Sequence, residues 1–343
     1  MPPSPDVVVI GGSGFIGGPL VASLAERGAT VRVLSRSVQS GAGTTPGVQC
    51  VRGDVTNPDD VSAAVQGARV VYHLAAGFGS TWQDFERVIV QGTRTVAEIC
   101  LQHHVERLIY ASSISALYLG GRGRIDERTG ADPKPAGRSH YSRAKGLAEQ
   151  LLRDLHARSN LPVVILRPGV VVGRGGMLNH GGLGIWGSDV CCIGWGRGRN
   201  PLPFVLVGDV VEALIQSADV PGIEGMTFNL AGDVRPTAAE FVKMLRSRSR
   251  RNFRFYPRSL WKMQALEAAK WLLKIIARKP ENPFPSYRDL KSRSLRCQLD
   301  CSLAKEKLGW QPVQTPEAFF AEAIDSHLLA IPVGDLRRPL VPV

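Results

Sequence analysis

Residues 6–17, DVVVIGGSGFIG, decide the fold of this chain. Residues 6–10 form a short β-branched apolar run, long enough for one buried strand. The glycine-rich stretch 11–17 follows at once, and residues 19–27 then have helical apolar spacing that Gly28 ends. Glycine permits a tight turn and a close approach of the backbone to a pyrophosphate, which the free N–H groups of the next helix also attract. The stretch therefore predicts strand, phosphate-binding turn and helix, the context in which such glycines bind a dinucleotide.

Downstream of this stretch, apolar runs alternate with helical segments as far as about residue 170. The strand-like runs lie at residues 6–10, 30–34, 69–74, 107–111 and 162–166, and helical periodicity is clear at residues 88–101 and 142–157. Such alternation predicts a parallel sheet with helices on both faces and a ligand at the carboxyl ends of its strands. The expected fold class is α/β, a Rossmann-type doubly wound parallel sheet.

The chain divides into two expected parts. A nucleotide-binding domain comprises residues 1–170 plus about 201–220, where strand-then-helix character returns. A smaller, discontinuous C-terminal substrate domain takes about 171–200 plus 225–330. The glycine-rich stretch 171–200 is expected to be a loop region on the substrate side.

Tyr141 and Lys145 stand four residues apart and therefore on one face of a helix. A free phenol titrates near ~10 and shuttles protons poorly at neutral pH. A nearby ammonium is expected to lower the pKa of the phenol, which makes it a general acid or base. This spacing alone arises by chance on many helices, but a cofactor loop upstream turns the pair into a predicted redox centre.

Matched in order, the motifs resemble the short-chain dehydrogenase/reductase superfamily, in particular its extended, NAD-dependent epimerase/dehydratase-like branch. Besides GGSGFIG and the Tyr–Lys pair, the matching elements are Gly53-Asp54-Val55, His73-Leu74-Ala75-Ala76, Tyr110-Ala111-Ser112-Ser113, Leu166-Arg167-Pro168-Gly169 and Leu308-Gly309-Trp310-Gln311-Pro312. The resemblance extends from about residue 5 to about residue 325 and is nearest to the 3-beta-hydroxysteroid dehydrogenase/isomerase-like subgroup. It implies an NAD(P)-dependent dehydrogenase or reductase.

The resemblance also implies the site residues. Tyr141 is the expected general acid/base, Lys145 modifies its pKa and binds the ribose, and Ser113 hydrogen bonds the substrate oxygen. Ser115, and after it Ser112, are the alternatives to Ser113. With the turn described above, the expected cofactor-binding residues are Gly11, Ser13, Gly14, Phe15, Ile16, Gly17, Arg36, Asp54, Val55, Leu74, Ala75, Ala76, Tyr141, Lys145 and Pro168. No metal site is expected.

The end of the second predicted strand bears on the choice of cofactor. NAD-preferring sites usually place an acid there to accept the ribose 2′-OH, but no acid lies between Ala29 and Cys50. Arg36 is instead suited to a charge-assisted pair with a 2′-phosphate. We therefore expect NADP(H) in preference to NAD(H); the alternative is a solvated Arg36 with NAD held by other contacts.

Departures from the superfamily pattern narrow the reaction. Dehydratases and decarboxylases of the family carry an acid just after the catalytic Ser or Thr, where this chain has Ile114-Ser115. Sugar-nucleotide epimerases often carry an Asn after the RP turn and an Arg before a later strand, where residues 169–171 are GVV and residues 201–204 are PLPF. Ile89 stands where related chains have the Asn of N-V-x-G-T.

These replacements favour an apolar substrate. The first hypothesis is hydride transfer between nicotinamide and a hydrophobic alcohol or ketone, such as a sterol-like, polyketide-like or long-chain hydroxy or keto compound. The second is a nucleotide-sugar epimerase with tightly bound NAD. The third, a non-catalytic nucleotide-binding protein, has no use for the Ser, Tyr and Lys that this chain retains.

The net charge of +12 is concentrated in residues 241–300, which hold sixteen Lys or Arg and four Asp or Glu, while the rest of the chain sums to zero. Residues 260–279 combine apolar and basic residues at helical spacing, with apolar side chains on one face and lysines on the other, as membrane-surface helices do. Two hypotheses follow: the basic segment 241–279 docks on an anionic membrane surface, or its helix caps the substrate pocket with its apolar face. Nucleic-acid binding is not expected, because no recognition motif accompanies the charge.

Location and assembly are less constrained by the sequence. We see no signal peptide and no uninterrupted apolar span of membrane length. The six cysteines form neither a zinc pattern nor a disulfide framework. The expected location is the cytoplasm, with peripheral membrane attachment if the basic segment docks on lipid. A homodimer is the assembly considered, although the sequence does not specify it.

Overall fold

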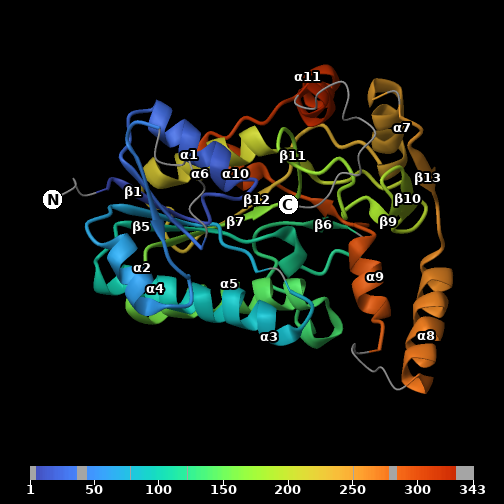
Figure 1. Ribbon diagram of the computed structural model, residues 1–343, viewed down its shortest axis with the longest axis horizontal. Helices are drawn as coiled ribbons and strands as arrows, with labels where there is room; N and C mark the ends of the chain where they lie inside the picture. The colour runs from blue at the N-terminus through green and yellow to red at the C-terminus, as the bar shows by residue number, and fades with distance from the viewer. Residues whose placement is uncertain are drawn as a thin grey trace.

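The computed structural model describes residues 5–36, 45–77, 79–121, 123–249, 251–277 and 284–329 (Figure 1). Its centre is a seven-stranded sheet with the order β12-β7-β5-β4-β1-β2-β3, parallel throughout. The strands are β1 (Val7–Ile10), β2 (Val31–Ser35), β3 (Val48–Arg52), β4 (Val70–His73), β5 (Arg107–Ala111), β7 (Val163–Pro168) and β12 (Thr227–Leu230). The order in which the chain adds strands reverses at β1: β2 and β3 lie on one side of it, and β4, β5, β7 and β12 lie on the other. This is the doubly wound arrangement. The predicted α/β fold class is confirmed.

Burial explains which strands the sequence revealed. All four side chains of β1 are buried, because β2 and β4 flank it and helices cover both faces. The five predicted strand runs are all present to within two residues. Strand β3 was not predicted, because its side chains at the sheet edge are mixed and none is fully buried.

Helices cover both faces of the sheet, and each face has its own apolar cluster. Helices α1 (Gly17–Glu26) and α6 (Val207–Asp219) pack together on one face. The other face carries α2 (Pro58–Val65), α4 (Gly92–Gln102) and α5 (His140–Ser159). Two short elements, α3 (Trp82–Phe85) and the π-helix η1 (Glu86–Gln91), lead into α4.

The rest of the described chain forms small sheets and helices beside the carboxyl ends of the strands (Figure 1). The sheets pair β8 (Val170–Val172) with β11 (Phe204–Leu206), β6 (Arg124–Ile125) with β14 (Gln298–Leu299), and β10 (Cys191–Gly194) with β9 (Gly184–Ser188) and β13 (Arg254–Tyr256). The α-helices are α7 (Ala238–Ser249), α8 (Leu260–Ile276), α9 (Tyr287–Arg293), α10 (Ser302–Leu308), α11 (Pro316–Phe320) and α12 (Ser326–Leu329). Short helical turns are η2 (Ile114–Ala116), η3 (Pro135–Gly137) and η4 (Ala321–Asp325).

One prediction here was wrong. The glycine-rich stretch 171–200, expected to be a loop region, contains the antiparallel hairpin β9–β10. Its glycines serve close packing: a side chain at Gly184 would collide with the backbone of Ile193, and one at Gly194 with the ring of Phe255. The strand-then-helix character expected after residue 203 is confirmed by β11 and α6.

None of the helices in the described part of the chain is both long and apolar enough to cross a membrane.

Candidate active site

The glycine-rich turn brings three backbone segments closer than side chains would allow. Gly11 has a φ of +89°, and a Cβ there would lie 2.9 Å from the backbone nitrogen of Ala75. A Cβ on Gly17, the first residue of α1, would lie 2.7 Å from the Cα of Gly12 and closer still to the carbonyl oxygen of Gly11. The start of α1 is therefore held against the turn and the end of β4, as a pyrophosphate site requires.

This turn borders a cavity of about 330 Å³ at the carboxyl ends of the central strands. Its lining includes every predicted cofactor-binding residue but one: Gly11, Ser13, Gly14, Phe15, Ile16, Gly17, Arg36, Asp54, Val55, Leu74, Ala75, Ala76, Tyr141 and Lys145. Pro168 is the exception, because it lies at the end of β7 and lines the neighbouring cavity instead. The glycine turn and this set of residues fit a dinucleotide; Pro168 fits the substrate side.

The far end of this cavity carries the residues expected near the adenosine. Arg36 follows directly after β2 and its side chain is exposed. The carboxylate of Asp54 accepts hydrogen bonds from the backbone N–H and the hydroxyl of Thr56, at 2.9 and 2.8 Å. The backbone hydrogen bond is the largest of the influences that lower the pKa of Asp54. Asp54 is therefore an anchored anion, and Arg87 and Arg36 are cations close enough to lower its pKa further.

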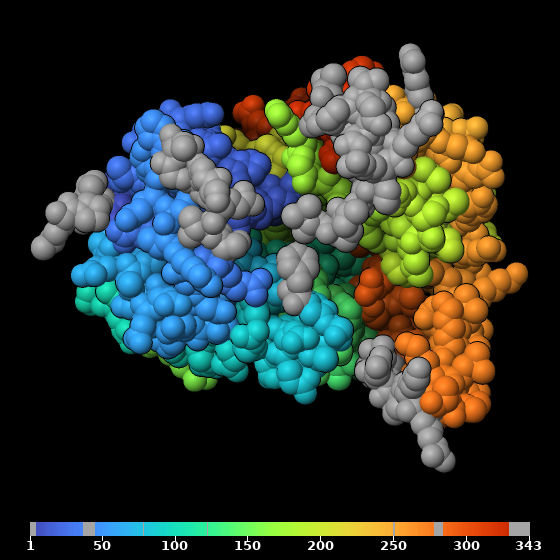
Figure 2. All heavy atoms as spheres, viewed as in Figure 1, coloured from blue at the N-terminus to red at the C-terminus, as the bar shows by residue number. Residues whose placement is uncertain are grey.

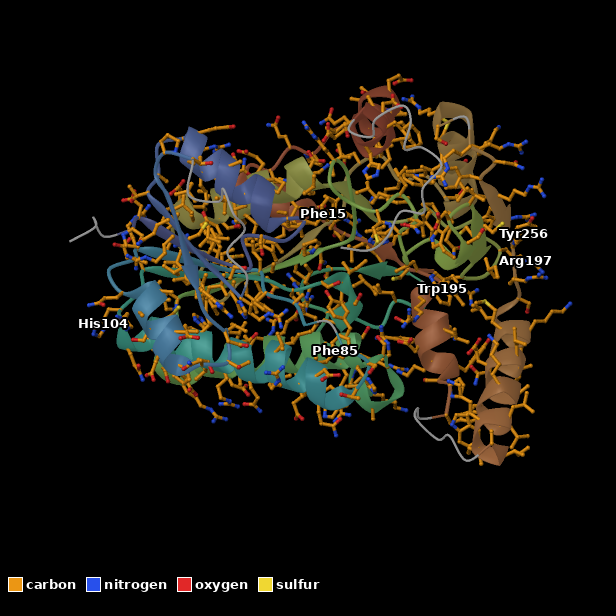
Figure 3. All side chains as sticks on the ribbon, viewed as in Figure 1. Phe15, Phe85, His104, Trp195, Arg197 and Tyr256 are labelled. Carbon is orange, nitrogen blue, oxygen red and sulfur yellow. The ribbon has the colours of Figure 1, made fainter. Side chains whose placement is uncertain are left out.

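A second cavity, of about 760 Å³, adjoins the first and shares Phe15, Ser112 and Tyr141 with it. Figure 3 shows Phe15, Phe85 and Trp195 reaching the middle of the molecule from three different parts of the chain. Its other walls come from η2, the start of α5, residues 168–171 and residues 292–295. This cavity lies where a substrate would meet the nicotinamide end of a bound cofactor.

Tyr141 connects the two cavities. It lies in the first turn of α5, where the Ser139 hydroxyl caps the helix by accepting the backbone N–H of Ser142. The Tyr141 phenol lies near enough to Ser113, which lines the second cavity, for the Ser113 hydroxyl to influence its pKa. Burial raises the pKa of Tyr141, and the Ser113 hydrogen bond only partly opposes it.

The prediction that Lys145 lowers the pKa of Tyr141 was wrong. The Lys145 ammonium points to the sheet, where it donates to the Tyr110 hydroxyl at 3.2 Å and to the carbonyl oxygen of Ala111 at 2.7 Å. Lys145 is buried, and this burial lowers its own pKa to about 7 while Glu149 opposes the shift. An ammonium that points to Tyr110 and Ala111 does not offset the effect of burial on the pKa of Tyr141.

Lys145 is held by buried polar groups, and Ile89, which stands where related chains have an Asn, is not one of them. Ile89 is fully buried within η1. The Tyr110 hydroxyl accepts a hydrogen bond from Lys145, and its pKa is influenced by Thr93, whose hydroxyl lies 3.0 Å from His73 Nε2. A buried polar chain from the ends of two strands therefore fixes Lys145.

Replacing Lys145 by Met is expected to change the free energy of unfolding of the cofactor-free protein in a pH-dependent way. Relative to the natural protein, the variant should be most stable near pH 7, and this advantage should shrink as the pH rises towards 10. The folded pKa is about 7 against an ordinary 10.5, so between these values the unfolded chain binds more protons. Stability of the natural protein then rises with pH by up to about 1.4 kcal/mol per unit. Denaturant titrations of both proteins across this range measure how the free energy of unfolding changes with pH. The hydrogen bonds lost in the variant shift its whole curve by a constant and do not change its slope. Parallel curves would contradict the buried-lysine assignment.

The three candidate serines have different environments. Ser112 is buried and donates to Glu149 at 2.6 Å, and Glu149 is ion-paired with the buried Arg167 at 2.6 Å. Ser112 is thus committed to a structural network. The Ser113 hydroxyl caps η2 by accepting the N–H of Ser115 at 3.1 Å and also reaches Tyr141. Ser115 lines the second cavity as well and remains the alternative.

Several residues of the second cavity carried no motif signal. His180 accepts the backbone N–H of Gly182 on its Nδ1 at 2.9 Å, which leaves the ring proton on Nε2. Burial lowers the pKa of His180 to about 4, so the ring is a neutral N–H donor at neutral pH. Arg138 and Arg293 also line the cavity, and both are paired with Asp289, at 3.2 and 2.6 Å. Only the richness of residues 171–200 in Gly and Trp hinted at this wall.

The cap hypothesis for the basic helix was wrong. Within the described chain, the second cavity is closed on this side by α9, Leu295 and Trp195, and α8 contributes no lining residue. The guanidinium of Arg293 lies 5.2 Å from the centre of the Trp195 ring. Of the basic segment, Arg250, Arg278 and Lys279 lie outside the described residues.

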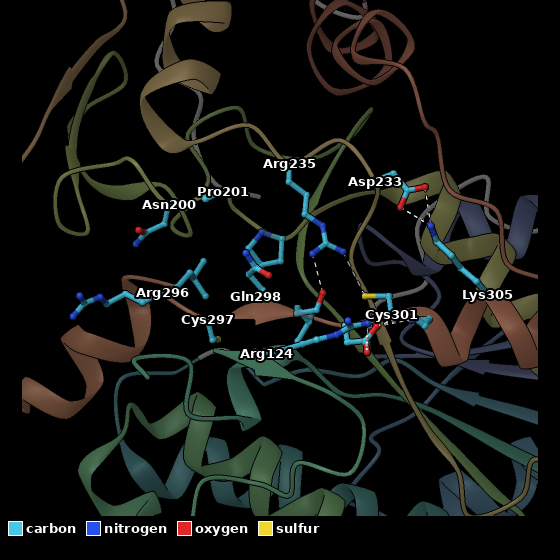
Figure 4. A pocket seen from close by; sticks show the side chains of 15 residues that line it. Arg124, Asn200, Pro201, Asp233, Arg235, Arg296, Cys297, Gln298, Cys301 and Lys305 are labelled. Carbon is cyan, nitrogen blue, oxygen red and sulfur yellow. Dashed lines mark hydrogen bonds and ion pairs between the residues drawn. The ribbon is translucent and has the colours of Figure 1, made fainter. Parts of the chain in front are cut away.

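Another cavity, of about 480 Å³, lies between the small sheets (Figure 4). Two of its cations are paired with carboxylates: Arg124 with Asp300, and Lys305 with Asp233, each at 2.6 Å. The Arg235 guanidinium donates to the carbonyl oxygen of Leu299 at 2.8 Å. These contacts join segments of the fold, and none of the predicted site residues is present. The part of the chain that the structure describes holds no cluster of three metal-ligating side chains.

Residues 7–231, more than half of the chain, match the model of the NAD dependent epimerase/dehydratase family. The chain belongs to that family.

Curated relatives and a solved structure agree with this placement. The chain is 30% identical to the mouse (Mus musculus) sterol-4-alpha-carboxylate 3-dehydrogenase, decarboxylating, over 66% of this chain and 63% of that protein. It is 31% identical to the 3-beta-hydroxysteroid dehydrogenase of Mycolicibacterium neoaurum, over 49% of this chain and 48% of that one. The chain therefore spans about half to two-thirds of these relatives. MoeE5 in complex with UDP-glucose and NAD shares the fold, with a TM-score of 0.71, 24% identity and coverage of 94% and 98%.

Proposed function

We propose that this enzyme transfers hydride between NADP(H) and a hydrophobic alcohol or ketone, of a sterol-like, polyketide-like or long-chain type. The observation that carries the proposal is the second cavity, whose walls include Ile114, Leu119, Val170, Leu295 and three aromatic rings. A steroid substrate is in keeping with the named activities of two relatives.

The charges of this cavity argue against a nucleotide sugar. Among its described lining residues, the two arginines are Arg138 and Arg293, and both are already paired with carboxylates. A diphosphate would therefore have to displace Asp289 or Asp132 to gain a cation. An epimerase with tightly bound NAD remains the second candidate because it fits the same fold.

The side chains at the junction of the cavities suit proton transfer beside the cofactor. The nicotinamide, when bound, supplies or accepts the hydride. Tyr141, whose raised pKa keeps it protonated at neutral pH, would give its proton to a carbonyl oxygen, and Ser113 would hold that oxygen by a hydrogen bond. Lys145, one helical turn after Tyr141 on α5, lines the cofactor cavity and would orient the ribose. His180 offers a further N–H to a second oxygen on the substrate.

A substrate screen tests this function. Purified enzyme is assayed for nicotinamide oxidation and reduction with apolar ketones and alcohols, each with and without a second oxygen distant from the reacting carbon. Net NADPH consumption with the ketones, fastest for those with two oxygens, is the expected result. Conversion of a UDP-sugar without net change in nicotinamide would favour the epimerase instead.

Replacing Arg36 by Ala is expected to weaken NADPH binding by about 10- to 100-fold and leave NADH binding unchanged. A charge-assisted pair with the 2′-phosphate contributes about 1.5–3 kcal/mol, and only NADPH carries that group. Titration calorimetry with both cofactors measures the two dissociation constants. Arg52, another exposed arginine on the neighbouring strand, provides the matched control as Arg52→Ala. Equal losses for NADH and NADPH would remove Arg36 as the 2′-phosphate ligand.

We propose the cytoplasm as the location, in keeping with the six cysteines of the sequence, whose spacing gives no disulfide framework. The proposed assembly is a homodimer. Gel filtration with light scattering measures the molar mass in solution and so distinguishes a dimer from a monomer.

A further inference from the structure

Helix α8 stands at the edge of the molecule and is packed along one side only (Figures 1 and 2). Its one buried side chain, among the described residues, is Met263. The remaining packing is with α9 and the segment before it: the rings of Trp261 and Tyr287 lie 5.5 Å apart, those of Trp271 and Phe284 5.2 Å apart, and Gln264 donates to the carbonyl oxygen of Pro285 at 2.6 Å. The rest of its surface faces solvent.

That outer surface is apolar. Five large side chains of α8 are more than half exposed: Trp261, Leu266, Leu272, Leu273 and Ile276. At 100° per residue they fall within one arc, with Ala265 and Ala269 between them and with Trp261, which contacts Tyr287, at its edge. Met263, Gln264 and Trp271 lie on the opposite side. A contiguous apolar patch of this kind marks an interaction surface. We call these five residues the outer face of α8.

Positive charge surrounds the outer face. Lys262 lies within the arc and Lys270 beside it, whereas Lys274 lies on the other side of the helix, where its side chain is also exposed. Lys270 pairs with Glu267 at 2.8 Å, whereas no carboxylate of the described chain pairs with Lys262 or Lys274. These lysines belong to the segment 241–300, which carries the whole net charge of +12.

The charge selects among partners for this apolar surface. Two copies of the chain joined through α8 would bring two strongly positive segments together, which opposes association. An anionic bilayer complements both features, because apolar side chains enter the acyl boundary while lysines contact the headgroups. We propose that the outer face of α8 docks the enzyme on the surface of an anionic membrane.

The docking surface is one helix away from the substrate cavity. Helix α8 packs on α9, and Ser292 and Arg293 at the end of α9 line that cavity together with Leu295. An apolar substrate dissolved in the bilayer would then be close to the cavity of a docked molecule. This last step rests on the proposed function; membrane docking itself does not.

Vesicle flotation tests the docking. The natural protein is mixed with vesicles of phosphatidylcholine alone and with vesicles that also contain phosphatidylserine. We expect binding to the anionic vesicles, and at least about tenfold weaker binding to the neutral ones. Two variants probe α8: Leu273→Ser with Ile276→Ser removes apolar contact, and Lys262→Glu with Lys274→Glu reverses charge. Both are expected to reduce binding at least tenfold, because all four side chains are exposed.

Matched controls keep the test decisive. Arg158→Glu with Lys307→Glu makes the same charge change at exposed positions of α5 and α10 and should bind as the natural protein does. Activity on a water-soluble ketone should be unchanged in all variants, so loss of docking is separable from failure of the proposed reaction. The proposal is overturned by indifference to lipid charge, by binding that survives both α8 variants, or by a dimer that those variants dissociate.

Discussion

Replacing Tyr141 by Phe is expected to lower kcat by about 10²–10⁴-fold and to leave the dissociation constant of the cofactor nearly unchanged. A positioned general acid contributes a rate factor of this size, and Tyr141 is the hydroxyl at which the two cavities meet. Phe keeps the ring that borders both cavities and removes only the proton donor. Steady-state kinetics with the best substrate of the screen, together with cofactor titration, separate the two effects.

Tyr118 provides the control for the loss of a phenol. Its ring lies 3.8 Å from the guanidinium of Arg288, and it lines neither of the two adjoining cavities. Tyr118→Phe should therefore retain kcat. If Tyr141→Phe kept a tenth or more of the natural kcat, another group would have to move the proton, and Ser115 would be the first to examine.

Replacing Gly17 by Ala is expected to weaken binding of either cofactor by about 10- to 100-fold. The added methyl group would meet backbone atoms of Gly11 and Gly12, and backbone cannot yield as a flexible side chain does. Overpacking of this kind costs about 1–3 kcal/mol. The turn relieves the strain by moving away from α1, and binding must restore the strained arrangement, which costs about tenfold in affinity per 1.4 kcal/mol.

Gly18 supplies a neighbouring control with the same chemical change. A Cβ there would lie 3.9 Å from the carbonyl oxygen of Gly12, an ordinary contact, and Gly18 does not line the cofactor cavity. Gly18→Ala should bind both cofactors normally and should stabilise α1 by up to about 1 kcal/mol, because Ala is the better helix former. Similar losses in affinity for Gly17→Ala and Gly18→Ala would show that general helix disruption, not contact with the turn, causes the effect.

Local patterns were sufficient for the nucleotide-binding half. A continuous apolar run such as β1 signals a strand buried on both faces, and the glycine turn admits few backbone arrangements. Consequently five of the strands could be predicted, and all but one of the predicted cofactor-binding residues line the first cavity. Pro168 lines the neighbouring cavity, because its position across the boundary of the two cavities depends on how β7 meets β5 and β12.

The electrostatics of Tyr141 and Lys145 could not be predicted from their spacing. Helical periodicity places both side chains on one face of α5, but it does not determine their partners across the sheet. The ends of β5 and α4 supply Tyr110, Ala111 and Thr93, and these determine where the ammonium points. Burial, which depends on the whole fold, then sets the direction of both pKa shifts.

The sequence by itself determined the family, the doubly wound sheet, the cofactor turn and the concentration of charge in residues 241–300, because each is encoded by neighbouring residues. Only the tertiary structure decided that Ser112 is bound to Glu149, that His180 and Arg293 line the substrate cavity, and that α8 turns its apolar side chains outward instead of over that cavity. These outcomes depend on contacts between segments far apart in the chain. A helix's periodicity shows that it has an apolar face, whereas the packing of its neighbours determines what that face meets.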